Sequence, residues 1–116
     1  MEKIRFTERD GTITAAIQGE LDHFLAASVR ADIDEKIKNL RPARFVLDVS
    51  GVSFMDSSGL GLIMGRYALC KSINTDFILS GADVRIKKIL DMAGLLSVIS
   101  TDDKPKGVDK VEKQTV

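Results

Sequence analysis

The stretch from Arg44 to Tyr67 constrains the fold most, because it joins a buried strand to a helix through an acidic, serine-rich turn. The run Phe45–Val49 is apolar and rich in β-formers, interrupted only by Asp48, which is typical of a strand covered on both faces. Asp56, Ser57 and Ser58 follow it, and their side-chain oxygens suit the N-terminus of a helix. The pattern therefore predicts that Ser57 or Ser58 lies at a helix start.

Between this strand and this helix the chain is expected to turn. Gly51 is predicted to end the strand. Val52, Phe54 and Met55 are apolar, so we expect them to carry the chain back into the interior. The helix that follows should run to about Lys71.

The N-terminal part predicts an antiparallel strand pair and then a helix. Asp10-Gly11 is a hairpin turn signal between a strand around Ile4 and Phe6 and a second strand from Thr12 to Gln18. The segment from Gly19 to His23 breaks the strand pattern, and apolar residues then recur at spacings of three and four. This helical face contains Ala26, Val29, Ile33, Ile37 and Leu40, and Pro42 ends the helix at about Arg41.

The C-terminal part predicts a further strand, a helix and a last short strand. Phe77–Leu79 forms the strand, Asp83 caps the helix, Gly94 closes it, and Leu96–Ile99 forms the last strand. Strands that alternate with helices imply right-handed crossovers and a mainly parallel sheet. We therefore predict a small α/β domain with an N-terminal β-hairpin, βα units and four to five strands.

Length and composition limit the remaining possibilities. The 116 residues suit one domain at 1–100, and the polar segment 101–116 is predicted to be loose, or a marginal helix around Val108 and Val111. The 17 basic and 17 acidic residues balance to +0, which argues against binding to nucleic acid or a membrane surface. Cys70 is the only cysteine, and no metal-ligand spacing or apolar signal segment is present. We expect a cytoplasmic protein without metal or cofactor.

Three glycines in the predicted helix need an explanation, since each costs roughly 1 kcal/mol relative to alanine. Gly61 and Gly65 are four residues apart and would let the helix approach the sheet closely. Alternatively, the missing side chains leave the surface of the first helical turns open, so that a partner's backbone or a phosphate can come near. A dinucleotide fingerprint beginning at Gly59 would need a glycine at Met64, so that motif is absent.

Catalysis by a serine triad is not supported. Ser57 and His23, with Asp22 or Asp56, supply the residue types, but the G-x-S-x-G motif fails because Met55 stands where its first glycine should be. Two interpretations of Ser57 remain. It caps the helix, or it is a modification site at which a phosphoryl group adds about −1.5 to −2 charge.

Two separated motifs carry a family resemblance. Phe54–Gly61, together with Gly19–His23, resembles the anti-anti-sigma factors of the STAS domain family, and the likeness extends to Gly65–Tyr67 and Asp91–Leu95. The resemblance implies that the serine directly after the aspartate of D-S-S-G, here Ser57, is a phosphorylated switch. It also implies a partner surface made of Glu20, Asp22, His23, Asp56, Ser57, Ser58, Gly59, Leu60 and Gly61.

The same resemblance implies a partner-switching mechanism. The unphosphorylated form is expected to bind an anti-sigma factor that is also a serine kinase, and so to release a sigma factor. Phosphorylation of Ser57 would end that binding, and a serine phosphatase would restore it, with ATP bound by the partner. Sporulation is the implied pathway. General-stress sigma control remains an alternative, as does a small nucleotide- or phosphate-binding protein that uses the helix start as an anion cradle.

Overall fold

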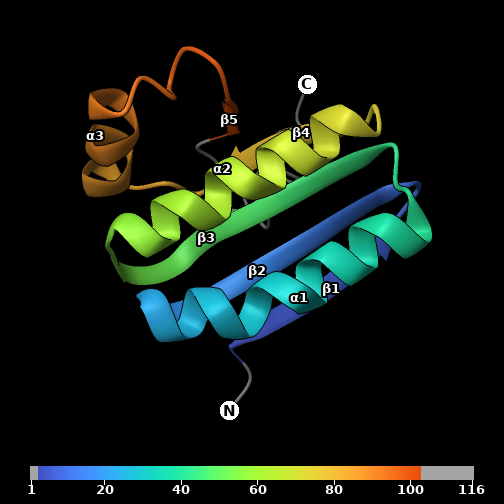
Figure 1. Cartoon of the computed structure of the whole chain (residues 1–116), viewed down its shortest axis with the longest axis horizontal. Helices are drawn as coiled ribbons and strands as arrows, with labels where there is room; N and C mark the ends of the chain where they lie inside the picture. The colour runs from blue at the N-terminus through green and yellow to red at the C-terminus, as the bar shows by residue number, and fades with distance from the viewer. Residues whose placement is uncertain (1–2, 103–116) are drawn as a thin grey trace, which may run out of the picture.

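The computed structural model describes residues 3–102. One five-stranded sheet has the order β1-β2-β3-β4-β5, with β1 antiparallel to β2 and the other neighbours parallel. The predicted α/β fold, with its N-terminal hairpin and mainly parallel sheet, is therefore confirmed (Figure 1). In chain order the elements are β1 (Ile4–Arg9), β2 (Thr12–Leu21), α1 (His23–Leu40), β3 (Arg44–Met55), α2 (Ser57–Ser72), β4 (Asp76–Ser80), α3 (Val84–Met92) and β5 (Ser100–Asp102).

The hairpin forms where its turn signal predicts it. Asp10 and Gly11 have φ values of 52° and 81°, and Arg9 pairs with Thr12 across the turn. Two consecutive residues with positive φ are what a two-residue type I′ turn requires. The turn matches the twist of the strands, so it fixes their register.

The core lies between the sheet and two helices. Helices α1 and α2 run side by side across one face of the sheet, and α3 lies beyond them on the β5 side (Figure 1). The predicted apolar face of α1 is buried, apart from Leu40, which is 48% exposed at the helix end. Inward residues of β2 and β3 pack against the helices, and the most deeply buried of these are Ile13, Ala15, Ile17, Leu21, Phe45, Leu47 and Val49.

Strand β3 is longer than predicted, because Gly51 does not end it. The pairing with β2 shifts twice, once after Ala16 and once after Gly19, and each shift leaves an extra residue on the β3 side. Such bulges allow the ladder to continue while the strand bends. The prediction that Phe54 turns into the interior is wrong, since its side chain is 50% exposed.

The predicted last strand at Leu96–Ile99 is also wrong. Val98 N and Ile99 N both donate to Leu95 O, so this apolar run forms a turn, and Ile99 is buried in the core. The strand begins at Ser100, which places residues 101 and 102, predicted as tail, within β5. The marginal helix predicted around Val108 and Val111 lies outside the described residues.

No helix within residues 3–102 is both long enough and apolar enough to cross a membrane.

Candidate functional site

Two strands end together at one edge of the sheet, and each leads directly into a helix. Glu20 pairs with Phe54 and Leu21 with Met55 in the parallel ladder. Asp56 N also donates to Leu21 O at 3.4 Å. The N-termini of α1 and α2 are consequently neighbours (Figure 1), so two segments far apart in the sequence form one surface. We call this surface the switch edge and define it as residues 20–24 and 54–61.

An aspartate caps each of these helices. Asp22 Oδ1 accepts a hydrogen bond from Leu25 N at 3.0 Å, and Asp56 Oδ1 accepts one from Ser58 N at 2.8 Å. Both caps satisfy backbone donors that the first turn of a helix leaves without intrahelical partners. Asp56 is therefore the cap of α2, and Ser57 is its first helical residue. The capping interpretation of Ser57 is wrong, because its neighbour fills that role.

The accessible residues of the predicted partner surface converge at this edge. Ser57 is exposed, as are Glu20, His23 and Gly61. Ser58 is half-buried, and so are Asp22, Asp56 and Leu60. Ser57 is thus an exposed residue at a helix N-terminus, where the partial positive charge of the helix dipole favours an anionic group.

Gly59 differs from the other residues of the predicted partner surface because it is buried. A Cβ at this position would collide with the Met55 side chain and come within 3.0 Å of Leu21 Cγ. Gly59 therefore allows α2 to pack closely on the ends of β2 and β3. The structure gives it a packing role rather than an exposed contact.

Gly61 and Gly65 do not bring the helix to the sheet, so that explanation of these two glycines is wrong. A Cβ at either position would have no atom within 4 Å. Both residues instead line a groove of about 400 Å³ between α1 and α2. The open space beside them favours the other explanation, in which the missing side chains leave the helix surface open to a partner or a phosphate.

Two exposed aromatic residues at the switch edge were not predicted. Phe24 is 80% exposed in the first turn of α1, and Phe54 is 50% exposed at the end of β3. Phe24 also lines a hollow of about 500 Å³ together with Glu20 and Asp22. A signal for Phe24 exists in the sequence, since it falls outside the buried face that begins at Leu25 and Ala26. The exposure of Phe54 depends on the bulged register, which has no local signal.

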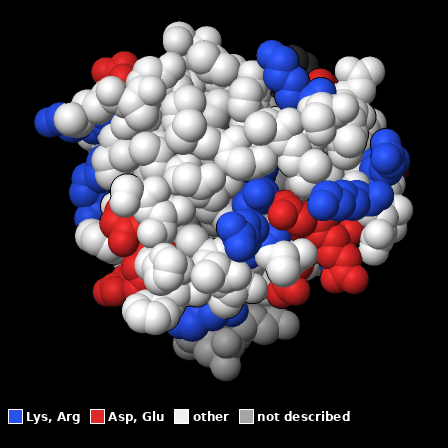
Figure 2. Space-filling view, viewed as in Figure 1, with Lys and Arg blue, Asp and Glu red and all other residues white. Residues whose placement is uncertain are grey.

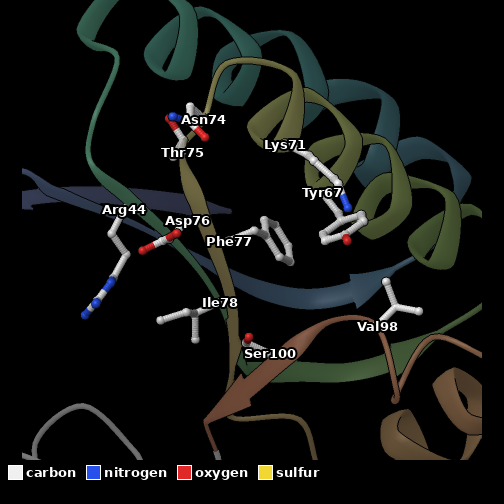
Figure 3. A pocket seen from close by; sticks show the side chains of 10 residues that line it. All are labelled: Arg44, Tyr67, Lys71, Asn74, Thr75, Asp76, Phe77, Ile78, Val98 and Ser100. Atoms are coloured by element: carbon white, nitrogen blue, oxygen red, sulfur yellow. The ribbon is translucent and has the colours of Figure 1, made fainter.

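A separate hollow of about 510 Å³ lies near the other end of α2 (Figure 3). Tyr67 and Lys71 line it from α2, and Phe77 from β4. The Tyr67 and Phe77 rings meet edge-on with their centroids 6.0 Å apart, so packed core side chains form part of its wall. None of its lining residues belongs to the switch edge.

Metal chemistry finds no support in this part of the chain. Among residues 3–102, no group of three or more His, Cys, Asp or Glu side chains is arranged to hold a metal ion. Cys70 is a free, buried cysteine, and burial raises the pKa of its thiol to about 11.

The fold of the described residues belongs to a known class of domain. The STAS domain pattern matches residues 3–110, and the chain belongs to the STAS domain family. It is 33% identical over 101 residues to the anti-sigma F factor antagonist of Paenibacillus polymyxa, covering 87% of this chain and 86% of the relative. It is 29% identical over 98 residues to the anti-sigma-B factor antagonist of Listeria monocytogenes, covering 83% and 84%.

A solved structure is also similar to this chain. The Bacillus cell fate determinant SpoIIAA in its phosphorylated form superposes with a TM-score of 0.71 at 26% identity, covering 93% of this chain and 98% of that chain. The predicted resemblance to the anti-anti-sigma factors of the STAS family is therefore confirmed.

Proposed function

We propose that this chain is an anti-sigma factor antagonist whose binding is switched off by phosphorylation of Ser57. The observation that carries the proposal is the position of Ser57, an exposed serine that is the first residue of α2 and lies beside the start of α1. Similarity to antagonists of anti-sigma F and anti-sigma-B factors supports the function. The phosphorylated form of SpoIIAA supports the modification.

The proposed partner is an anti-sigma factor that is also a serine kinase and binds ATP itself. It would contact the switch edge, including the polar residues Glu20, Asp22 and His23. The centres of protein interfaces are depleted in charged residues and enriched in aromatic ones. Phe24 and Phe54 supply exposed aromatic rings, and Figure 2 shows a broad uncharged area over α2. We add both phenylalanines to the proposed contact surface.

Phosphorylation would act on the complex more than on the free domain. In the free chain, solvent and the dipole of α2 both accommodate a phosphoryl group on the first helical residue. In the complex the same group would be desolvated beside the Asp56 carboxylate. Leaving a charge unpaired at an interface typically costs about 2–5 kcal/mol. The complex should therefore separate while the fold persists, until a serine phosphatase removes the group.

The test is to incubate the chain with its cognate kinase and ATP and to locate the phosphate by mass spectrometry. We expect one phosphate, on Ser57. Ser58→Ala is the matched control and should still be phosphorylated, whereas Ser57→Ala should not. A phosphate at another position would refute the assignment. So would a Ser57→Ala variant that loses kinase binding as completely as Ser57→Asp does.

Sporulation is the pathway we propose, in the cytoplasm, since the relative at 33% identity antagonises an anti-sigma F factor. General-stress control is the second candidate, favoured by the anti-sigma-B factor antagonist at 29% identity. Reconstitution with both kinases of one organism separates the two. Release of sigma F alone supports sporulation, and release of sigma B alone supports stress control.

A further inference from the structure

We propose that the kinase-binding surface extends beyond the switch edge to the start of α3, where Val84 gives the partner an apolar contact. This inference rests on the proposed function, because it names a further part of the same partner's contact surface. Each side of a stable protein interface typically contains about 20–30 residues. The switch edge comprises only residues 20–24 and 54–61, and some of these are buried. A stable complex therefore needs neighbouring surface as well.

The sheet topology brings a third helix start to this edge. Strands β2, β3 and β4 are parallel neighbours, so all three end at the same side of the sheet, and each leads into a helix. Helix α3 therefore begins on the same side as α1 and α2. Figure 1 shows it at the same end of the sheet as the start of α2. A partner that covers the switch edge can reach the start of α3 without leaving this side of the molecule.

Two contacts hold the start of α3 against the end of β3. Arg85 Nη2 donates a hydrogen bond to Ser53 O at 3.1 Å. Gly81, in the segment before α3, lies so close to β3 that an added Cβ would come within 2.6 Å of Ser50 Cβ. Val84 is therefore held beside the end of β3 before any partner binds. Such preorganisation lowers the cost of ordering the surface on association.

The exposed side chains at this junction are apolar, and the charges beside them are paired. Val84 is 82% exposed as the first residue of α3, and Phe54, which follows Ser53, is 50% exposed. The charged neighbours of Val84 compensate one another, because Arg85 Nη2 lies 3.2 Å from Asp83 Oδ2. Interface centres are depleted in charged residues. The partner surface that fits this junction is therefore apolar rather than charged.

Calorimetric titration of the cognate anti-sigma kinase with Val84→Asp tests the proposal, with a Tm measured for each variant. The new carboxylate would be desolvated against an apolar partner, so we expect binding at least about tenfold weaker than that of the parent protein. Val84→Asp should stay folded, because Val84 is exposed and an acidic residue is favoured in the first turn of a helix. Val84→Ala, which adds no charge, should weaken binding by a smaller factor.

Met92→Asp is the matched control. Met92 is 80% exposed, as Val84 is, but it lies at the other end of α3. The control should bind the kinase as tightly as the parent protein does. An equal loss of binding in Val84→Asp and Met92→Asp would overturn the proposal, because it would show an effect of charge that does not depend on position.

The remaining outcomes separate this inference from the proposed function. Unchanged kinase binding by Val84→Asp, while phosphorylation of Ser57 ends binding by the parent protein, would overturn the inference and leave the function intact. A parent protein that does not bind the kinase would overturn both. Sedimentation equilibrium tests for the other occupant of this surface, a second copy of the chain. Self-association that Val84→Asp abolishes, with kinase binding unchanged, would assign the surface to that second copy and overturn the proposal.

Discussion

Alanine substitutions at three glycines of α2 should change stability in opposite directions. All three residues lie in the helix, so intrinsic helix propensity alone predicts the same gain of about 1 kcal/mol at each. Their surroundings differ. Gly61 and Gly65 have open space where a Cβ would stand, whereas Gly59 meets the buried Met55 and Leu21 side chains.

The expected magnitudes follow from these contacts. Gly61→Ala and Gly65→Ala should each raise the free energy of unfolding by about 1 kcal/mol, since nothing opposes the gain in propensity. Overpacking a buried site typically costs about 1–3 kcal/mol. Gly59→Ala should therefore range from neutral to about 2 kcal/mol less stable than the parent protein. The difference between position 59 and the other two positions is about 1–3 kcal/mol.

Thermal unfolding of the three single variants measures this difference. A change of 1 kcal/mol shifts the Tm of a domain of this size by roughly 4 °C or somewhat more. Gly61→Ala and Gly65→Ala should unfold at higher temperature than the parent protein, and Gly59→Ala at the same or a lower temperature. If Gly59→Ala stabilises the chain as much as Gly61→Ala does, the packing role assigned to Gly59 is refuted.

Three further predictions concern the caps, the thiol and the aromatic surface. Asp56→Ala should lower the free energy of unfolding by about 1 kcal/mol in urea titrations, because it removes the cap of α2. Asp56→Asn should retain most of the stability. An unchanged unfolding midpoint for Asp56→Ala would contradict the capping role of Asp56. Cys70 should react slowly with iodoacetamide at pH 8 and rapidly in urea. A thiol whose pKa is about 11 is ionised in only about one molecule per thousand at that pH. Equal reaction rates in the folded protein and in urea would refute the burial of Cys70. Phe24→Ala and Phe54→Ala should weaken kinase binding in calorimetry with little change in Tm, because both rings are exposed; a large loss of Tm would instead place them in the core.

Local signals explain why the order of the elements was predictable from the sequence. A turn or a cap depends only on residues a few positions apart. Asp10-Gly11 forms the hairpin turn, and Asp56 and Asp83 cap α2 and α3. The apolar spacing of α1 likewise predicts its buried face. The position of Ser57 at a helix start follows from the same kind of information.

The features that escaped prediction depend on contacts between distant segments. The length of β3 and the exposure of Phe54 follow from two register shifts against β2, which no local pattern encodes. The roles of Gly59 and Gly65 depend on what faces each side of α2 after it has packed on the sheet. Leu96–Ile99 has the composition of a strand, but hydrogen bonds to Leu95 O fold it into a turn.

The central claim is that phosphate on Ser57 controls association and leaves folding intact. Calorimetric titration of the cognate anti-sigma kinase with the unmodified and the Ser57-phosphorylated chain tests it most directly, with a Tm measured for each form. We predict that phosphorylation weakens binding by about 30-fold or more, the equivalent of about 2 kcal/mol or above, while the Tm changes by no more than about 2 °C. Equal affinities for the two forms, or a loss of binding accompanied by unfolding, would contradict the account.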